Sequence, residues 1–273
     1  TFSIGGQYPV GALAKGSDSN FYGTTSEGGT LGNGTVFRIT PAGVLTTLHT
    51  FDNSNGKRPI GGLTLASDGA FYGTTESGGS SGQGTIFKVT SAGLHTVLIH
   101  FSGSNGSFPH SPPIQGSDGN FYGVASQGGA SGNGVVYKLT PAGVYSVLAS
   151  FDGVTGQFPT GALVQGADGN FYGTTEAGGS GSGTVFRITA SGTLTTQFSF
   201  DGTRGAKPEA ALVQGGDGNF YGTTDGGGAA SAGAVFRMTP AGTLTLLASL
   251  GGTKGTGSRA ALVAGGDGQF YGT

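Results

Sequence analysis

Basic side chains recur at one place in a repeated motif, where they could bind anions. The motif reads Val-Phe-Arg-Ile-Thr at its clearest, and every complete copy has a cation there: Arg38, Lys88, Lys138, Arg187 and Arg237. Five cations at equivalent positions could engage an acidic polysaccharide. The alternative is an ion pair within each repeat, because an acid follows a Phe-Tyr-Gly motif at Glu76, Glu176 or Asp225, and one place later at Glu27. We favour the ion pair.

Three aromatic side chains precede prolines in loops that lead into a repeat. They are Tyr8, Phe108 and Phe158, which stand before Pro9, Pro109 and Pro159. Rings in such loops could stack on sugars, and they could equally fix the loop against its own strands. Both readings stay open, and we count the three rings as candidate ligand-binding residues.

The histidines do not form a recognisable catalytic or metal-binding set. His49, His95, His100 and His110 occupy different positions in the repeat, and no His-x-His or His-Glu-x-x-His spacing occurs. We therefore expect surface or loop residues. His110 is the exception of interest, because the third repeat departs most from the others, with Val124, Ala125 and Gln127. Any specialised binding face is expected near His110.

Carboxylates recur in a turn that could be read as a calcium loop. An Asp-Gly pair followed by Asn, as at Asp168, offers oxygen ligands of the kind that Ca²⁺ prefers. Each repeat supplies one such carboxylate, and turn formation already explains these residue types. Neither a Gly-x-Ser-x-Gly elbow nor a Walker loop is present. The sequence predicts no metal, no cofactor and no enzyme.

The element that must position all these residues is a repeat of about fifty residues. Its Phe-Tyr-Gly anchor begins at Phe21, Phe71, Phe121, Phe171, Phe220 and Phe270, so the spacing is 50 residues with one interval of 49. A repeat of this length is one supersecondary unit that buries its apolar faces against its neighbours. We read residues 1–273 as a single repeat array.

The fourth repeat shows the strands of one unit most clearly. An apolar run over 161–166, an Asp-Gly turn and the anchor strand 171–175 read as a hairpin, and strands over 184–189 and 193–200 follow. Apolar residues occupy both faces of these strands, so the sheet must be sandwiched between neighbours. Four short antiparallel strands per repeat predict an all-β β-propeller. A parallel β-helix is the structural competitor.

Composition excludes several other classes of protein. Charged residues make up 10% of the chain and the net charge is −2, which argues against a nucleic-acid partner. Cys is 0, so neither disulfides nor zinc thiolates are available. No apolar run approaches the roughly 18 residues of a membrane helix.

The repeat resembles a known bacterial family. Gly34 to Gly43 reads Gly-Thr-Val-Phe-Arg-Ile-Thr-Pro-Ala-Gly, and with Asp168 to Thr175 it is similar to the GloVer (Gloeo/Verruco) tandem repeat over essentially the whole chain. That resemblance implies exported, often surface-anchored bacterial proteins. The strand order also resembles the NHL repeat, a propeller family often of six blades. The kelch repeat is only weakly suggested, and WD40 fits poorly because Trp is 0.

These observations lead to one expected architecture. Five complete units and a half unit are present, and Thr1-Phe2 aligns with Thr50-Phe51 at the end of a fourth strand. We therefore expect a six-bladed ring closed by strands from both ends. The alternative is an open half blade that pairs with a neighbouring copy and makes a fibre.

The expected function is a non-catalytic module at the cell surface or in a surface fibre. It would be extracellular, structural or ligand-binding, with a polysaccharide or copies of itself as partner and no transmembrane segment. The alternative is a polysaccharide lyase or hydrolase with a single site at the propeller mouth.

Overall fold

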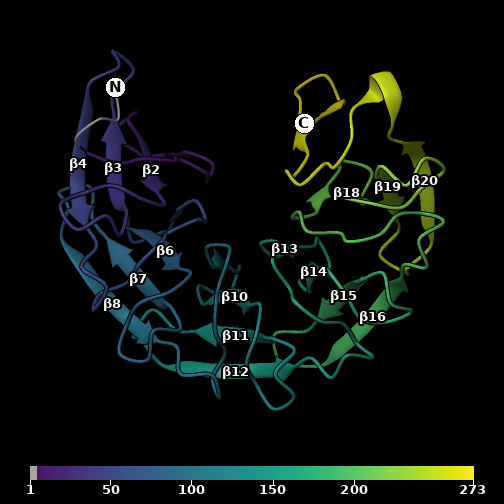
Figure 1. The fold of residues 1–273 in the computed structure, drawn as a ribbon, viewed down its shortest axis with the longest axis horizontal. Coiled ribbons are helices and arrows are strands. Elements are labelled where there is room, and N and C mark those ends of the chain that lie inside the picture. Colours follow the sequence, from purple (N-terminus) through teal and green to yellow (C-terminus); the bar gives the residue numbers. More distant parts are fainter. Residues whose placement is uncertain (1–4) are drawn as a thin grey trace. The chain divides into compact units, whose positions relative to one another are not determined.

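The strands form small antiparallel sheets, one for each repeat. This computed structural model describes residues 5–273. In it every complete repeat forms a four-stranded sheet in chain order, which we call a blade (Figure 1). Within the described residues the only helix is η1 (Gly252–Lys254), three residues long. The all-β prediction is confirmed.

The five complete blades have strands of nearly constant length. Blade 1 contains β1 (Ala14–Lys15), β2 (Phe21–Thr25), β3 (Thr35–Ile39) and β4 (Leu45–Thr50). Blade 2 contains β5 (Thr64–Leu65), β6 (Phe71–Thr75), β7 (Thr85–Val89) and β8 (His95–His100). Blade 3 contains β9 (Ile114–Gln115), β10 (Phe121–Ala125), β11 (Val135–Leu139) and β12 (Tyr145–Ser150).

The remaining strands follow the same order. Blade 4 contains β13 (Val164–Gln165), β14 (Phe171–Thr175), β15 (Thr184–Ile188) and β16 (Leu194–Ser199). Blade 5 contains β17 (Val213–Gln214), β18 (Phe220–Thr224), β19 (Ala234–Met238) and β20 (Leu244–Ser249). A half blade of two strands then ends the chain, β21 (Val263–Ala264) and β22 (Phe270–Tyr271).

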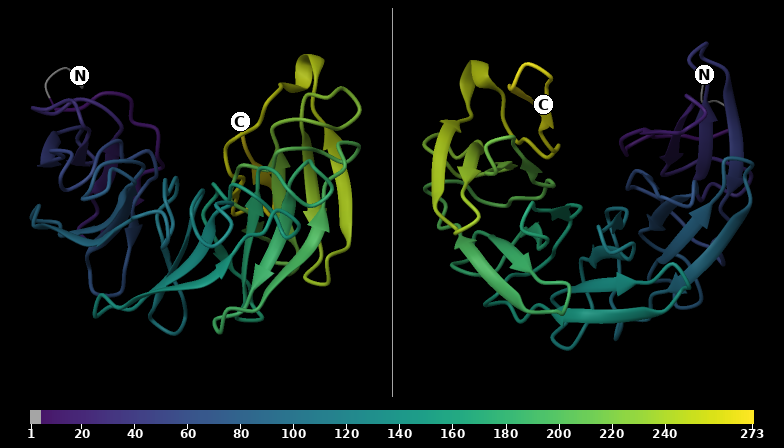
Figure 2. Two further views of the ribbon diagram at one scale, coloured as in Figure 1. Left: turned by 60° about the horizontal axis from the view of Figure 1, so that its bottom comes forward. Right: turned by 180° about the vertical axis from the view of Figure 1, so that it is seen from behind.

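The chain divides into two compact units. The first unit contains the residues up to Gly128 together with Tyr137–Ser146. The second contains Gly129–Val136 and Val147–Thr273. Two further views show strands of each complete blade lying side by side (Figure 2). Closure of a six-bladed ring stays a prediction. The expected alignment of Thr1-Phe2 with a fourth strand lies outside the described residues.

The first hairpin of each blade is set by its Asp-Gly turn. In blade 4, Val164 pairs with Tyr172 and Gln165 with Phe171. The Gly166 N–H donates to the Asn170 carbonyl at 2.8 Å, and Gly169 has φ of 79°. Glycine is favoured there because L-residues with a side chain rarely adopt a left-handed backbone. The turn therefore fixes which residues of the anchor strand face which neighbour.

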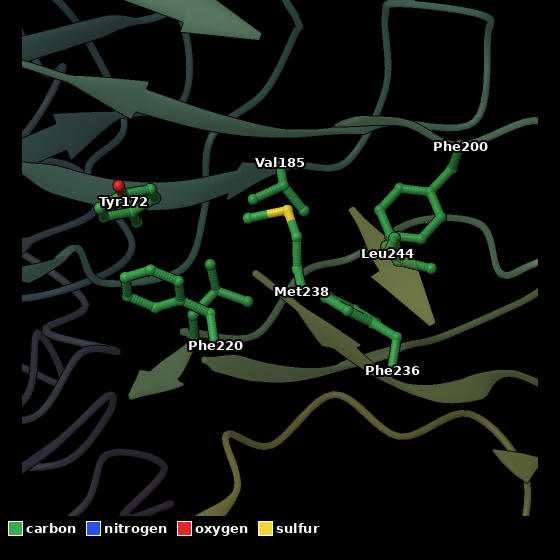
Figure 3. Close-up of a cluster of buried hydrophobic side chains, with 8 residues drawn as sticks. Tyr172, Val185, Phe200, Phe220, Phe236, Met238 and Leu244 are labelled. Carbon is green, nitrogen blue, oxygen red and sulfur yellow. The ribbon is translucent and has the colours of Figure 1, made fainter. Parts of the chain in front are cut away.

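The apolar cores lie between successive blades. In the second unit, Tyr172, Val185 and Phe200 of blade 4 pack with a matching set from blade 5: Leu212, Phe220, Phe236, Met238 and Leu244. Figure 3 shows the Met238 side chain pointing toward Val185. Blades 1 and 2 of the first unit share a core of the same kind. In blade 2, Phe71 lies in the core shared with blade 1 while Tyr72 stacks on Phe121 of blade 3, which confirms the inference that both faces of a blade are covered.

Two contacts recur where one blade meets the next. Within each unit, the tyrosine of one anchor stacks on the phenylalanine of the next, with centroids 4.1 Å apart for both Tyr22 with Phe71 and Tyr172 with Phe220. The Thr174 hydroxyl donates to the Ala210 carbonyl at 3.0 Å. The third repeat has Val124 at the threonine position and cannot supply that hydroxyl.

Candidate functional site

The turn aspartates bind side chains of their own blade. The tyrosine four residues after each aspartate donates its hydroxyl to the carboxylate, at 2.7 Å for Tyr22 with Asp18 and 2.9 Å for Tyr172 with Asp168. The Asn170 amide also donates to Asp168 at 2.7 Å. These carboxylate oxygens therefore hold the hairpin together. In the described part of the chain, no three His, Asp or Glu residues are grouped so as to hold a metal ion.

Two of the five repeated cations form ion pairs with these same aspartates. The Lys88 Nζ lies 2.7 Å from an Asp68 oxygen and 5.6 Å from the centroid of the Tyr72 ring. Lys138 lies 3.5 Å from Asp118. The sequence suggested Glu76 as the partner of Lys88, but the partner is Asp68. The register explains the difference, because Tyr72 stands opposite Lys88 and its hydroxyl already reaches Asp68.

The Asp118 carboxyl shows the electrostatic result of this arrangement. Burial opposes its ionisation, but the Asn120 and Tyr122 hydrogen bonds and the charge of Lys138 outweigh burial and lower its pKa to about 2. The carboxylate is therefore charged throughout the neutral range, and it pairs with a lysine that remains a cation. Neither group is poised to exchange a proton near pH 7.

The three arginines of the set take a different contact. Arg38, Arg187 and Arg237 each stand opposite the anchor tyrosine in the strand register. Burial raises the pKa of Tyr172 to about 12, with a further rise from Asp168, while Arg187 acts in the opposite direction. No ion pair within 4.0 Å joins Arg187 to Asp168. A role of any of the five cations in binding an acidic glycan stays a prediction.

The residues before the prolines have an unusual backbone, which in blades 2 to 5 links the loop to the preceding blade. Tyr8, Arg58, Phe108, Phe158 and Lys207 all have φ between 53° and 56°, a left-handed conformation that is uncommon for residues with side chains. The Arg58 N–H donates to the Asn33 carbonyl of blade 1 at 2.9 Å, and the Arg58 carbonyl accepts from the Glu76 N–H of blade 2 at 3.0 Å. The backbone hydrogen bonds thus hold the loop in place, and the side chain takes no part in them.

Side chains at this loop differ in exposure and chemistry from blade to blade. The Tyr8 ring is 64% exposed, whereas Phe108 and Phe158 are half-buried. The sequence left sugar stacking and loop fixation as alternatives. In all five loops the carbonyl of this residue accepts a backbone hydrogen bond from its own blade. Sugar stacking on these rings stays a prediction.

Charged groups gather at the same loops, and we call these places the junctions. A junction comprises the residue before the proline, the residue after it, and the residue that follows the anchor strand. In the first unit, Glu76 pairs with Arg58 at 2.9 Å and lies 3.7 Å from the His110 Nε2. His110 thus lies in a charged junction, although the predicted specialised face around it stays untested.

The second unit holds the larger charged junction. The Arg259 guanidinium pairs with Asp225 at 2.9 Å and lies 3.5 Å from Glu209. Burial raises the pKa of Glu209, and the negative charges of Glu176 and Asp225 add to that effect, while Arg259 opposes it. The hydrogen bond from Arg259 lowers the pKa of Asp225. Two carboxylates that share one guanidinium are therefore shifted in opposite directions.

Sequence reasoning missed Glu209 and Arg259, although the repeat contains a signal for them. The residue after the junction proline, or after Ser258 in the half blade, is different in each of the six repeats: Val10, Ile60, His110, Thr160, Glu209 and Arg259. The residue before the proline varies as well, whereas the anchor strand and its turn hardly change. Variation at the junctions beside a nearly constant anchor marks a place that the fold does not dictate.

Two histidines occur where the sequence did not place them. His49 on β4 and His95 on β8 stack between blades 1 and 2, with ring centroids 3.8 Å apart and planes 3° apart. Their Nε2 atoms are buried and have no hydrogen-bond partner. The expectation of surface or loop residues was wrong for this pair, because the sequence does not reveal which fourth-strand positions face each other across a blade interface.

The chain belongs to the Gloeobacter/Verrucomicrobia repeat family. The repeat matches residues 2–115 and 65–273, which together span almost the whole chain. The family resemblance given by the sequence is confirmed. No curated protein is similar enough to the chain to count as a match.

Solved structures with the same architecture are distant in sequence. A gluconolactonase from Xanthomonas campestris superimposes with a TM-score of 0.58 at 14% identity, covering 98% of this chain and 84% of that one. A candidate 6-phosphogluconolactonase from Bacteroides uniformis gives 0.60 at 16%, covering 95% and 76%. The extracellular domain of a two-component system from B. thetaiotaomicron gives 0.63 at 13%, covering 95% and 32%.

These similarities establish the fold of the chain as a β-propeller. A gluconolactonase and an extracellular domain of a two-component system both occur among the similar structures, so the fold leaves the activity open. Among the described residues, no helix is long and apolar enough to cross a membrane.

Proposed function

We propose that the chain is a non-catalytic ligand-binding module that works outside the cell and engages a glycan through its junctions. One observation carries the proposal: variable side chains stand at the junctions of a constant frame. Backbone hydrogen bonds hold each junction loop, so the side chains there can differ without loss of stability of the blade. Exposed rings and paired charges on rigid loops are typical of binding surfaces.

The nature of the variable residues supports a hydroxyl-rich ligand. Tyr8 presents an exposed ring, and the Glu209–Arg259–Asp225 group presents carboxylate and guanidinium atoms within 3.5 Å of one another. Sugars offer apolar faces for stacking and hydroxyls that both donate and accept hydrogen bonds. An extracellular setting agrees with the extracellular domain of a two-component system that has the same fold.

Binding to a panel of neutral and acidic polysaccharides tests this proposal. We expect Tyr8→Ala and Arg259→Gln each to weaken binding about tenfold, the range of a moderate hot spot. Leu94→Ala is the matched control, because Leu94 is 69% exposed and lies outside the junctions. Unchanged affinity in both junction variants, or equal loss in the control, would reject the proposal.

The second candidate is a hydrolase or lyase centred on Glu209. Two nearby carboxylates whose pKa values are shifted in opposite directions are common in acid–base catalysis, and Glu209 and Asp225 have this property. Under the proposal above, neither lactones nor polysaccharides are turned over. Turnover that disappears in Glu209→Gln while glycan binding persists would establish the enzyme instead.

A further inference from the structure

The residue before each junction proline holds a backbone conformation that glycine would adopt more easily. Arg58, Phe108, Phe158 and Lys207 all have φ between 53° and 56°. In the Asp-Gly turns the left-handed position is instead a glycine, as at Gly169 with φ of 79°. A Cβ makes this conformation unfavourable, whereas glycine adopts it freely. Where only the course of the backbone matters, in the turns, this chain uses glycine.

The junction loop itself does not require a side chain at this place. The Lys207 N–H donates to the Ser182 carbonyl of blade 4 at 2.9 Å, and the Lys207 carbonyl accepts from the Asp225 N–H of blade 5 at 3.0 Å. In the next repeat, Gly257 has φ of 65°, and its N–H donates to the Ala232 carbonyl at 3.0 Å in the same way. Glycine therefore supports the same link to the preceding blade.

Contacts within the chain do not account for the Lys207 side chain. Lys207 is exposed, and among the residues that the structure describes none forms an ion pair or a hydrogen bond with its ammonium. Arg58 differs, because it pairs with Glu76 at 2.9 Å. Strained residues cluster at ligand sites, where the strain is retained because the side chain is useful there. Lys207 combines such strain with a cation that is available to a ligand.

The charges around Lys207 indicate what kind of ligand fits. Burial raises the pKa of Glu209, and the charges of Arg259, Glu176, Asp225 and Lys207 all act on it as well. Three carboxylates and two cations thus lie close together, with a net charge of −1. The net negative charge disfavours an anion, and the guanidinium beside Glu209 disfavours a cation. Hydroxyl groups suit the site, because a hydroxyl accepts from an ammonium and donates to a carboxylate.

We propose that Lys207 contacts the ligand of this junction and that the ligand is an uncharged glycan. The Lys207 ammonium donates to one sugar hydroxyl, and the Glu209 carboxylate accepts from a neighbouring hydroxyl. This inference rests on the proposed function, because it requires that the junctions bind a glycan. It adds that the left-handed residue before the proline is retained for binding, since the loop would form with glycine.

Stability and binding should respond differently to Lys207→Gly. Relief of the left-handed strain offsets the greater freedom that glycine gives the unfolded chain, so Tm should stay equal or rise. Affinity for the best bound of cellohexaose, xylohexaose and mannohexaose should fall about tenfold, as measured by titration calorimetry. Lys207→Met keeps the strained backbone without the charge, and it should lose the same affinity at unchanged Tm. A lower Tm in Lys207→Gly would show that the side chain serves the fold, which overturns the inference.

A matched variant separates a contact at Lys207 from a general effect of charge. Arg204 lies outside the junctions, 5.9 Å from the centroid of the Phe198 ring, and Arg204→Met removes one positive charge, as Lys207→Met does. Affinity for the same hexasaccharide should stay within about twofold of the parent chain. An equal loss in Arg204→Met would overturn the assignment of Lys207.

The remaining outcomes distinguish this inference from the proposed function. Hexagalacturonate is the acidic probe, and it should bind at least about tenfold more weakly than the best neutral hexasaccharide. Stronger binding of hexagalacturonate, or binding of none of the four probes, overturns the inference, and the wider polysaccharide panel still tests the proposed function. Affinity that falls in Arg259→Gln but persists in Lys207→Met overturns the inference and supports the proposed function.

Discussion

Two blade interfaces can be compared, one between blades 1 and 2 and one between blades 4 and 5. They share the buried rings at their centre, which we call the frame, and they differ at the outer strands. Both contain a tyrosine–phenylalanine stack and a phenylalanine at the end of the fourth strand, Phe51 in one and Phe200 in the other. The first interface has the His49–His95 pair, where the second has Phe198 and Leu244. The fold therefore requires the central rings and accepts polar rings at the outer strands.

The largest expected effect tests the shared frame. Phe51 and Phe200 are both fully buried, and each meets the third-strand phenylalanine of the next blade, at 5.2 Å for Phe87 and 5.4 Å for Phe236. Phe51→Ala and Phe200→Ala should each reduce the free energy of unfolding by about 3–5 kcal/mol, from lost burial and the cavity left behind. Urea denaturation gives both values.

Equal losses of free energy of unfolding in Phe51→Ala and Phe200→Ala would strengthen the comparison. Leu94→Ala, at an exposed position, should change the free energy of unfolding by less than about 0.5 kcal/mol. A loss at Phe51 that is much smaller than the loss at Phe200 would show that the two interfaces do not share one frame.

The next effect is a difference in pH dependence between the interfaces. Burial lowers the pKa of His95 from 6.5 to about 3, with a further decrease from His49, and burial also lowers the pKa of His49 while Asp52 opposes that shift. An unfolded histidine binds a proton near pH 6.5, whereas the folded pair resists protonation. Stability is therefore full above pH 6.5 and falls as the pH is lowered toward 3.

The expected loss at pH 5 is about 1 kcal/mol for His95, after allowance for solvent screening of a partly exposed ring, and His49 contributes in the same direction. The double variant His49→Phe with His95→Leu copies the other interface and should flatten the stability profile between pH 7 and pH 4.5. Aspartates with lowered pKa values lose their contribution only below about pH 4. Acid sensitivity that persists in the double variant would contradict the assignment.

The two interfaces also show how much of the structure could be predicted from the sequence. Phe-Tyr-Gly spacing and Asp-Gly turns depend on local chemistry, so the four strands of each blade and the identity of the buried rings followed from the sequence. The stacking of His49 on His95 did not, because these residues are at different repeat positions. Only the offset between fourth strands of adjacent blades brings them together.

The same distinction applies to the candidate site. The cations that we selected from the sequence recur in every complete repeat, and recurrence marks positions that serve the frame, as Lys88 does with Asp68. Glu209 and Arg259 do not recur, and they lie at one junction. In a repeat array the departures from the period at a fixed position carry more information about binding than the period itself.

The smallest expected effect concerns the repeated cation, which is lysine in blade 2 and arginine in blade 4. Lys88 reaches Asp68, and both side chains are partly exposed, at 33% and 40%. Such a pair contributes about 0–1 kcal/mol, so Lys88→Ala should lower Tm slightly. Arg187→Lys should be neutral or slightly stabilising, because a lysine in that register can reach Asp168 as Lys88 reaches Asp68.

Glycan binding decides whether these cations serve the blade or a ligand. If they serve the blade, Arg187→Ala lowers Tm while affinity for acidic polysaccharide stays within about twofold of the parent chain. Thermal unfolding and polysaccharide binding are measured on the same preparations, with Lys88→Ala as the matched variant from the other unit. Affinity lost in both variants with Tm unchanged would reverse the interpretation, since a cation that only pairs within its sheet has no reason to affect a ligand.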